Sequence, residues 1–114
     1  MKGEIYISKK KTVNKKLIKG KFYLHNDKNG GHPSLIFDKN DNKNYYKAIQ
    51  FSTSRGTNRA RMRHNLNPNS NDDQFVMNRP IDGKRKDFST KELNRLRVHK
   101  DDKPLINKIK RKNK

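Results

Sequence analysis

The excess of positive charge is the feature that most constrains what this chain can fold into. Among its 114 residues, 30 are Lys or Arg and 11 are Asp or Glu, which gives a formal net charge of +19 at pH 7. A compact chain with this charge repels itself, so folding stability does not explain the excess. The usual partner of such a chain is a polyanion, RNA or DNA. Charge alone does not distinguish binding, cleavage and packaging of that partner.

Apolar residues are scarce and concentrated in short runs. The hydrophobic fraction is 28% and the mean hydropathy is −1.37. The runs at residues 35–37 and 48–51 predict one small core, and the length supports one domain. We expect this domain over residues 17–114, with a basic C-terminal tail. A basic arm over residues 1–16 precedes it and is either solvated or adds an edge strand.

The composition excludes several classes of protein. The chain has no cysteine, so disulfides and thiolate-bound metals are ruled out. No apolar run approaches the length that spans a membrane, and the first residues lack the apolar core of a secretory signal. We therefore expect a cytoplasmic protein without a membrane partner. The four histidines show no metal-ligand spacing, so neither a metal nor another cofactor is expected.

The order of apolar runs and turn residues predicts several short strands. We expect strands over residues 17–25, 33–38, 45–54 and 74–78, loops over 26–31, 39–44 and 65–73, and a turn over 79–83. The strands over 33–38 and 45–54 flank a short polar turn. They should therefore form an antiparallel hairpin.

Two helices are expected towards the C-terminus. Ser89, Thr90 and Glu92 form a capping box before an apolar pair, which predicts a short helix. Asp101 or Asp102 would cap a last helix that has a proline in its first turn and one apolar face. The fold class expected is mainly β (α+β), a small half-open β-barrel with short helices, including a C-terminal one.

Five segments, taken in order, resemble the MazF/PemK (Kid) toxin family. They are an opening strand at residues 20–24, a Gly-rich loop and apolar strand at 30–37, a strand ending in Thr-Ser at 48–54, the loop at 55–59, and a strand with a proline at 76–80. The resemblance covers roughly residues 17–110. Each motif alone has low specificity, whereas their order and spacing together are moderately specific.

This resemblance implies an SH3-like barrel, metal-independent endoribonuclease activity and a possible homodimer. It also implies an antitoxin, either an acidic protein or a small RNA. Two positions depart from the family pattern. His32 stands where the family has an arginine before proline, and Asn78 stands where it has an acidic residue, whereas Thr53 matches the family threonine. The RNA-binding fold is therefore better supported than the usual catalytic set.

Metal-free RNA cleavage needs a base for the 2′-OH, an acid for the leaving 5′-oxygen and cations for the phosphorane. His32 is the leading acid or base, because imidazole titrates near neutrality. Thr53 would hydrogen-bond a phosphate or position the 2′-OH. Arg55 and Arg59 would clamp the scissile phosphate, because guanidinium matches phosphate oxygens. The alternatives are an ordinary turn histidine, a strand-end hydroxyl that caps the backbone, and a solvated basic loop.

Further residues are expected to contact nucleic acid. They are Ser52, Ser54, Arg61, Arg63, His64, Lys43 and Tyr46. Arg61 and Arg63 would follow neighbouring phosphates. His64 is a candidate second proton-transfer group, whereas His25 and His99 look less well placed.

The adjacent residues Tyr45 and Tyr46 should point in opposite directions along their strand. One then faces the core, and the other faces solvent and is the better candidate to stack on a base. The sequence does not say which tyrosine faces out.

Three functions remain open at this point. The first is a toxin-like endoribonuclease of a toxin–antitoxin or phage-defence system, which cleaves single-stranded RNA by 2′-OH attack. The second is a non-catalytic RNA- or DNA-binding module from a phage or plasmid. The third is a basic partner of an acidic protein, since opposite charge speeds association.

Overall fold

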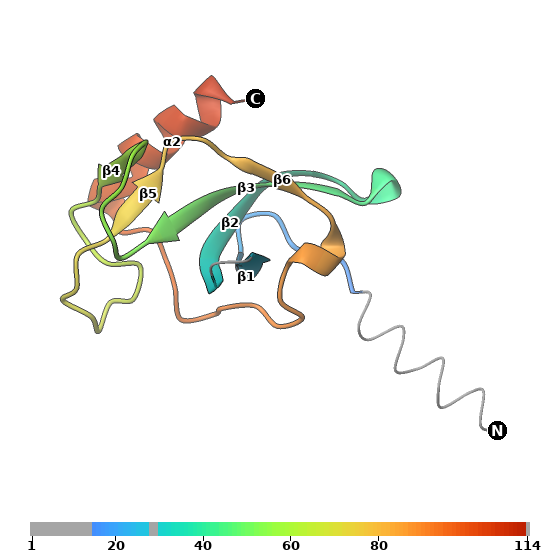
Figure 1. The fold of residues 1–114 in the computed structure, drawn as a ribbon, viewed down its shortest axis with the longest axis horizontal. Helices are drawn as coiled ribbons and strands as arrows, with labels where there is room; N and C mark the ends of the chain where they lie inside the picture. Colours follow the sequence, from blue (N-terminus) through green and yellow to red (C-terminus); the bar gives the residue numbers. More distant parts are fainter. Residues whose placement is uncertain (1–14, 28–29, 114) are drawn as a thin grey trace.

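The computed structural model describes residues 15–27 and 30–113, a β-rich domain with one α-helix (Figure 1). Its strands are β1 (Phe22–Asp27), β2 (Gly30–Asn40), β3 (Tyr45–Ser52), β4 (Arg59–Arg61), β5 (Phe75–Met77) and β6 (Ile81–Gly83). The helices are the 3-10 turns η1 (Asp41–Lys43), η2 (Arg85–Asp87) and η3 (Lys100–Asp102), and the α-helix α2 (Lys103–Lys112). The predicted mainly β fold with a C-terminal helix is confirmed. The predicted N-terminal arm lies, except for residues 15–16, outside the described residues.

The strands form a six-stranded antiparallel sheet, in which five strands follow the order β1-β2-β3-β5-β4 and β6 pairs with β3 beside this path. β2 takes one edge of β3, and the other edge is shared by β6 in its first half and β5 at its end. The predicted hairpin of residues 33–38 and 45–54 is confirmed, since Ser34 lies opposite Gln50 and Asn40 lies opposite Tyr45. A β-bulge between Ile36 and Asp38 interrupts this register.

Both hairpin loops are shorter than predicted. β1 pairs with β2 out to Asp27 opposite Gly30, so residues 26–27 and 30–31 are strand and the predicted loop is wrong there. Residues 28–29 lie outside the described residues. At the other end of β2, pairing continues to Asn40, so only η1 and Asn44 connect it to β3. Asn44 has φ of +50°, a left-handed conformation that asparagine tolerates well.

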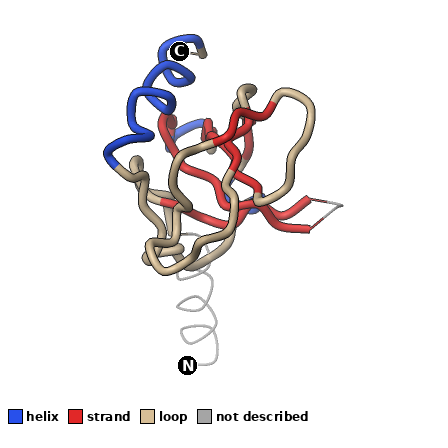
Figure 2. The backbone as a smooth tube through the Cα atoms, turned by 90° about the vertical axis from the view of Figure 1, so that its left-hand side faces the viewer, coloured by secondary structure: helices blue, strands red, loops and turns tan. Residues whose placement is uncertain are grey.

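The central strands are buried on both faces, which explains their apolar runs. One core contains Leu35 and Phe37 of β2. The other contains Ile36, because successive side chains of a strand point to opposite faces. Ile106 and Ile109 of α2 belong to the first core, and Figure 2 shows this helix on one side of the strands.

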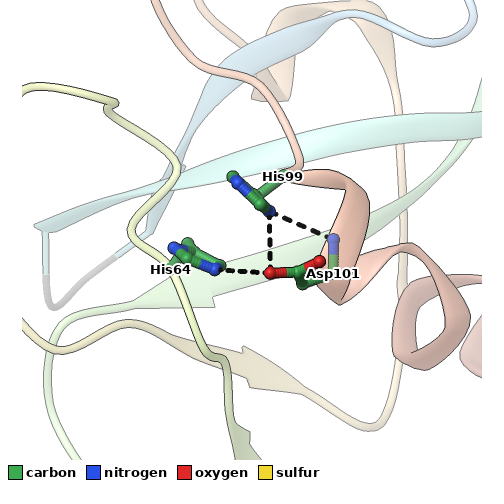
Figure 3. A group of neighbouring side chains, drawn as sticks. All are labelled: His64, His99 and Asp101. Carbon is green, nitrogen blue, oxygen red and sulfur yellow. Dashed lines mark hydrogen bonds and ion pairs between the residues drawn. The ribbon is translucent and has the colours of Figure 1, made fainter.

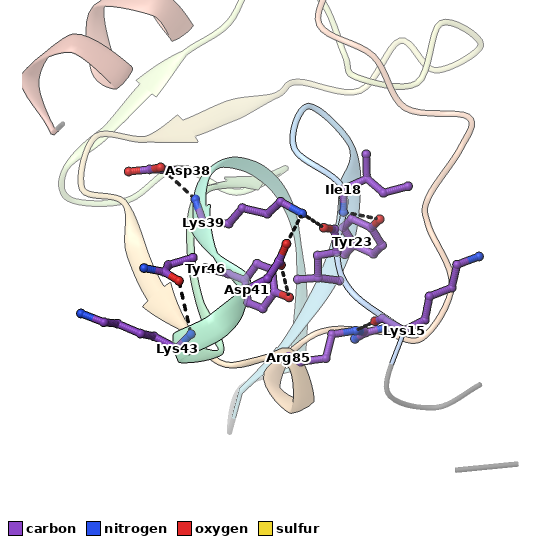
Figure 4. Close-up of polar contacts among 11 residues, drawn as sticks. Lys15, Ile18, Tyr23, Asp38, Lys39, Asp41, Lys43, Tyr46 and Arg85 are labelled. Atoms are coloured by element: carbon purple, nitrogen blue, oxygen red, sulfur yellow. Dashed lines mark hydrogen bonds and ion pairs between the residues drawn. The ribbon is translucent and has the colours of Figure 1, made fainter. Parts of the chain in front are cut away.

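The segment before β1 closes the second core. Leu17 is fully buried there, and its carbonyl oxygen accepts a hydrogen bond from Lys39 Nζ at 2.9 Å. The carbonyl oxygen of Lys15 accepts another from Arg85 Nε (Figure 4). The strand predicted from residue 17 starts later, because Gly20 adopts φ of +89° and turns the chain before β1.

The helix predicted from the capping box at residues 89–92 is wrong. The Ser89 Oγ accepts the Leu24 N–H at 3.0 Å and donates to the Lys91 carbonyl at 2.8 Å. The backbone N–H groups of Ser89 and Leu93 donate to the carbonyls of Leu24 and Phe22 in β1. The chain from residue 88 to 93 therefore lies along the outer edge of β1 as an irregular segment, the edge strap. β1 supplies the hydrogen-bond partners that a helix would have supplied.

The turn predicted over residues 79–83 is also partly wrong. Residues 81–83 form β6, which pairs with β3 through Ile81 opposite Ala48 and Gly83 opposite Tyr46. The predicted loop over 65–73 is confirmed, as is a strand within 74–78.

α2 confirms the predicted last helix, with Asp102 before it and Pro104 in its first turn. The Asp102 side chain, however, does not cap the helix. It is buried, and its two oxygens accept the backbone N–H groups of Arg63 at 2.7 Å and His64 at 3.0 Å. The start of α2 is therefore joined to the chain that follows β4.

Over residues 15–27 and 30–113, none of the helices has both the length and the apolar character required to cross a membrane.

Candidate nucleic-acid interface

A pocket of about 340 Å³ lies where β2 begins and β3 ends. His32, Ser52, Thr53 and Ser54 all line it. The sheet brings them together: continuing the register in which Ser34 lies opposite Gln50 by two residues places His32 across from Ser52. Two of the four predicted catalytic residues, His32 and Thr53, therefore share one surface, which we call the His32 pocket.

The wall of the His32 pocket is held by a buried glutamine that the sequence analysis missed. Gln74 Nε2 donates to the Ser52 carbonyl at 3.0 Å, and Gln74 Oε1 accepts the Leu66 N–H at 3.1 Å. Gln74 is 5% exposed, so both bonds are shielded from water. They tie the end of β3 to the 65–73 loop. No pattern in the sequence marks Gln74, because its two partners are 22 and 8 residues away along the chain.

Arg59 is bonded to this strand end. Its Nη1 donates to Ser52 Oγ at 3.0 Å and to the Ser54 carbonyl at 2.8 Å. Ser52 is 8% exposed, so its hydroxyl positions Arg59 rather than presenting a surface to RNA. A Cβ atom on Gly56 would lie 3.0 Å from Arg59 Nε, so the bare glycine lets the guanidinium lie across the 54–58 turn.

The side chains of three predicted catalytic residues are accessible to solvent. Thr53 and Arg55 are exposed, whereas Arg59 is half-buried. Both bonds from Arg59 use Nη1, and a guanidinium carries five N–H donors, so other donors can reach a phosphate. The Thr53 hydroxyl therefore lines the His32 pocket, and the Arg59 guanidinium is bonded to Ser52 and Ser54, which also line it.

His25, to which the sequence analysis gave little weight, is the cross-strand partner of His32 in the β1–β2 pairing. Its Nδ1 lies 3.2 Å from Gln50 Nε2, an amide nitrogen that can only donate, so Nδ1 is the acceptor. The edge of its ring packs on Phe88, with ring centroids 5.2 Å apart. The interval of six residues between His25 and His32 was the available signal, but it became meaningful only with the strand register.

Two more arginines and His64 lie beyond the His32 pocket. Arg61, Arg63 and His64 line a second pocket of about 570 Å³, which shares Asn65 and Gln74 with the first. Arg61 is paired with Asp73 at 2.9 Å, whereas Arg63 is exposed. Arg61 and Arg63 therefore lie next to the His32 pocket, although the Asp73 carboxylate partly neutralises Arg61.

His64 also belongs to a side-chain cluster that the sequence analysis did not find (Figure 3). Its Nε2 lies 3.0 Å from Asp101 Oδ2, and its ring stacks on His99 with centroids 3.7 Å apart. His99 Nδ1 lies 3.5 Å from the same Asp101 oxygen. Spacing along the chain did not reveal this cluster, because the two histidines lie 35 positions apart. Only the short interval from His99 to Asp101 pointed to it.

Two of the predicted nucleic-acid contacts lie elsewhere. Lys43 is in η1 and Tyr46 is near the start of β3, at the opposite end of that strand from the His32 pocket. Tyr46 is 2% exposed and donates its hydroxyl to Asp41 at 3.1 Å, so the prediction that Tyr46 contacts nucleic acid is wrong. Burial, followed by the bond to Asp41, raises the Tyr46 pKa.

The expectation that one of the two adjacent tyrosines faces inward is confirmed. Tyr45 is the partly exposed one, and its hydroxyl donates to Asp82 at 2.9 Å. Burial and then this bond raise the pKa of Tyr45.

Within the described residues, few cations are neutralised by carboxylates. The Lys and Arg ion pairs there are Lys39 with Asp41 at 3.0 Å and Arg61 with Asp73 at 2.9 Å. The bond from Lys39 is the main reason that the pKa of Asp41 is lowered. With a net charge of +19, this leaves a strongly positive surface for a polyanion.

Comparisons with protein-family models, with curated proteins and with solved structures find no match to this chain.

Proposed function

We propose that this protein is a toxin-like, metal-independent endoribonuclease that cleaves single-stranded RNA, as part of a toxin–antitoxin or phage-defence system. The observation that carries the proposal is the His32 pocket, in which an imidazole, the exposed Thr53 hydroxyl and the adjacent Arg59 meet at one strand end. The similarity of residues 17–110 to the MazF/PemK family supports the same activity. The proposal includes that family's half-open SH3-like barrel and an antitoxin that covers the site.

The proposed reaction begins when His32 takes the proton of the 2′-OH. The 2′-oxygen attacks the adjacent phosphorus, the bond from phosphorus to the 5′-oxygen breaks, and a 2′,3′-cyclic phosphate forms. The leaving 5′-oxygen takes a proton and becomes a 5′-hydroxyl. His25, the cross-strand partner of His32, is the candidate donor in its doubly protonated form, which requires the Gln50 amide to turn its oxygen towards Nδ1. Arg55 and Arg59 stabilise the charge on the phosphorane, and Thr53 hydrogen-bonds a phosphate oxygen.

A cleavage assay tests this function. Purified protein in EDTA would be incubated with single-stranded RNA and, separately, with single-stranded DNA, beside the His32→Ala and Thr53→Ala variants. We expect cleavage of RNA alone, with cyclic phosphate ends. Removing His32 should reduce the rate by about 10²–10⁴-fold, the range for a lost general acid or base.

The matched control is Lys43→Ala, which removes one exposed cation at the far end of β3. This variant should cleave RNA at a rate close to that of the unaltered protein. Cleavage that persists in His32→Ala, or that is lost equally in Lys43→Ala, would contradict the assignment of the site.

The second candidate is a non-catalytic nucleic-acid-binding protein. The observation that favours it is that Arg59 Nη1 already donates hydrogen bonds to Ser52 and Ser54, as a purely structural arginine would. RNA that stays intact but shifts in mobility would support this candidate over the enzyme. If the chain instead bound an acidic protein and not RNA, it would be the basic partner of that protein.

A further inference from the structure

His64, His99 and Asp101 form a compact set of metal-ligand atoms apart from the His32 pocket (Figure 3). We propose that these three residues bind one divalent transition-metal ion of the Zn²⁺ class. The one nitrogen from each histidine and the Asp101 oxygen all lie within 4.8 Å of one another. Two imidazoles and one carboxylate are a donor set that zinc prefers.

The spacing of the three atoms already approximates that of a coordinated set. Zinc binds histidine nitrogen and carboxylate oxygen at about 2.0–2.2 Å, so neighbouring ligands of a tetrahedral site lie roughly 3.3 Å apart. The Asp101 oxygen is 3.0 Å from His64 Nε2 and 3.5 Å from His99 Nδ1. The ion would replace the proton between His64 and Asp101. The two stacked rings would then tilt so that their nitrogens converge on the metal, a rotation that these partly exposed side chains can make.

The protonation of His99 suits this role. The backbone N–H of Asp101 donates to His99 Nδ1 at 3.1 Å, so Nδ1 carries no proton. A metal requires this form of histidine, and it would take over the lone pair that the N–H now uses. The carboxylate is also available, because among the described residues Asp101 lies beside these two histidines and forms no ion pair with Lys or Arg.

The backbone around the cluster is fixed independently of any ion. Asp102 is 2% exposed and accepts the N–H groups of Arg63 and His64, which holds His64 beside the η3 turn. His99 and Asp101 come from that same turn. The ligands are thus supplied by two chain segments that are already joined, so little ordering is required on binding.

A fourth coordination position can be filled from the adjoining cavity. A pocket of about 310 Å³ is lined by His64 and His99 together with Ser70 and Asn71. It leaves room for water or a polar side chain to complete four-coordination. A bound ion would therefore link the chain after β4 to the start of the C-terminal helix. This role is separate from the proposed RNA cleavage.

Zinc titration of the full, tag-free chain tests the proposal. EDTA-stripped protein would be titrated with Zn²⁺ by calorimetry, with Mg²⁺ as the metal that should not bind, since it prefers oxygen ligands. We expect one equivalent of Zn²⁺ to bind and to raise the melting temperature. His64→Ala and Asp101→Asn should each weaken binding by at least about 10–100-fold, the loss seen when even outer-shell groups are removed.

The control variant is His25→Ala, which removes a histidine outside the cluster and should leave zinc affinity unchanged. Absence of binding, or binding that His64→Ala and Asp101→Asn do not weaken, would overturn the proposal. Circular dichroism would show that both variants remain folded, which is expected because the His64 and Asp101 side chains are exposed. RNA cleavage in EDTA is measured separately, so the two proposals can fail independently.

Discussion

At the scale of single residues, two adjacent aspartates near the start of α2 have opposite roles. Asp101 is exposed and contacts the imidazoles of His64 and His99. Asp102 is buried and uses both oxygens on backbone N–H groups 38 and 39 residues earlier in the chain. A buried donor without an acceptor is destabilising, so the second aspartate contributes to stability and the first to surface chemistry.

This difference predicts unequal effects of the same substitution. Asp102→Asn replaces one accepting oxygen by an NH₂ group that faces an N–H donor, so we expect a loss of about 1–3 kcal/mol in the free energy of unfolding. Asp101→Asn changes the net charge equally but should alter that free energy by less than about 0.5 kcal/mol, as for other exposed positions. Urea unfolding of both variants measures the difference. Equal losses would contradict the roles assigned here.

At the scale of elements, the edge strap protects one side of the sheet. β1 is the end strand, and an uncovered end strand exposes N–H and C=O groups to pairing with other chains. The strap bonds to the Leu24 N–H and to the carbonyls of Leu24 and Phe22. These partners of the strap in β1 therefore lie 65 or more residues away in sequence, rather than in a local helical turn.

The Ser89 side chain is expected to contribute more to the stability of this strap than the Thr90 side chain does. In Ser89→Ala the Leu24 N–H loses its acceptor, so the free energy of unfolding should fall by about 1 kcal/mol. Thr90→Ala is the matched control, since the Thr90 side chain is exposed. Thermal unfolding of the two variants compares them, and a larger loss in Thr90→Ala would mean that the strap is held differently.

At the scale of the whole molecule, the net positive charge governs binding of a polyanionic partner. Within the described residues, the Lys and Arg side chains that form ion pairs with carboxylates are Lys39 and Arg61. The remaining cations repel one another in the free protein, and a polyanion relieves that repulsion. Binding of nucleic acid should therefore release counterions and depend steeply on salt.

Fluorescence anisotropy with a labelled single-stranded RNA tests this expectation, using His32→Ala so that the RNA stays intact. With 6–10 phosphate contacts, affinity should fall by about 10³–10⁵-fold between 50 and 200 mM salt. A labelled DNA of the same length shows how much of the binding is specific to RNA. A shallow dependence on salt would contradict an interface built on phosphate contacts.

The sequence by itself determined the local features of this protein. The apolar runs at 35–37 and 48–51 identify the strands, because a strand buried on both faces needs consecutive apolar residues. The apolar face and proline of the last helix identify α2, because they follow the helical repeat. His32 and Thr53 were assigned to one site from their chemistry and the family resemblance, and they meet because they flank one hairpin, whose register depends on local pairing.

Tertiary structure alone decided the features whose partners are distant along the chain. The capping box at residues 89–92 predicts a helix, yet β1 offers hydrogen bonds that hold the same residues as a strap. Tyr46 was predicted to contact RNA, whereas packing buried it and left Tyr45 partly exposed. The meeting of His64, His99 and Asp101 likewise depends on Asp102 joining the chain after β4 to α2. Local sequence carries the propensities of each segment, but it does not reveal which distant segment will compete for the same hydrogen bonds or cover the same side chain.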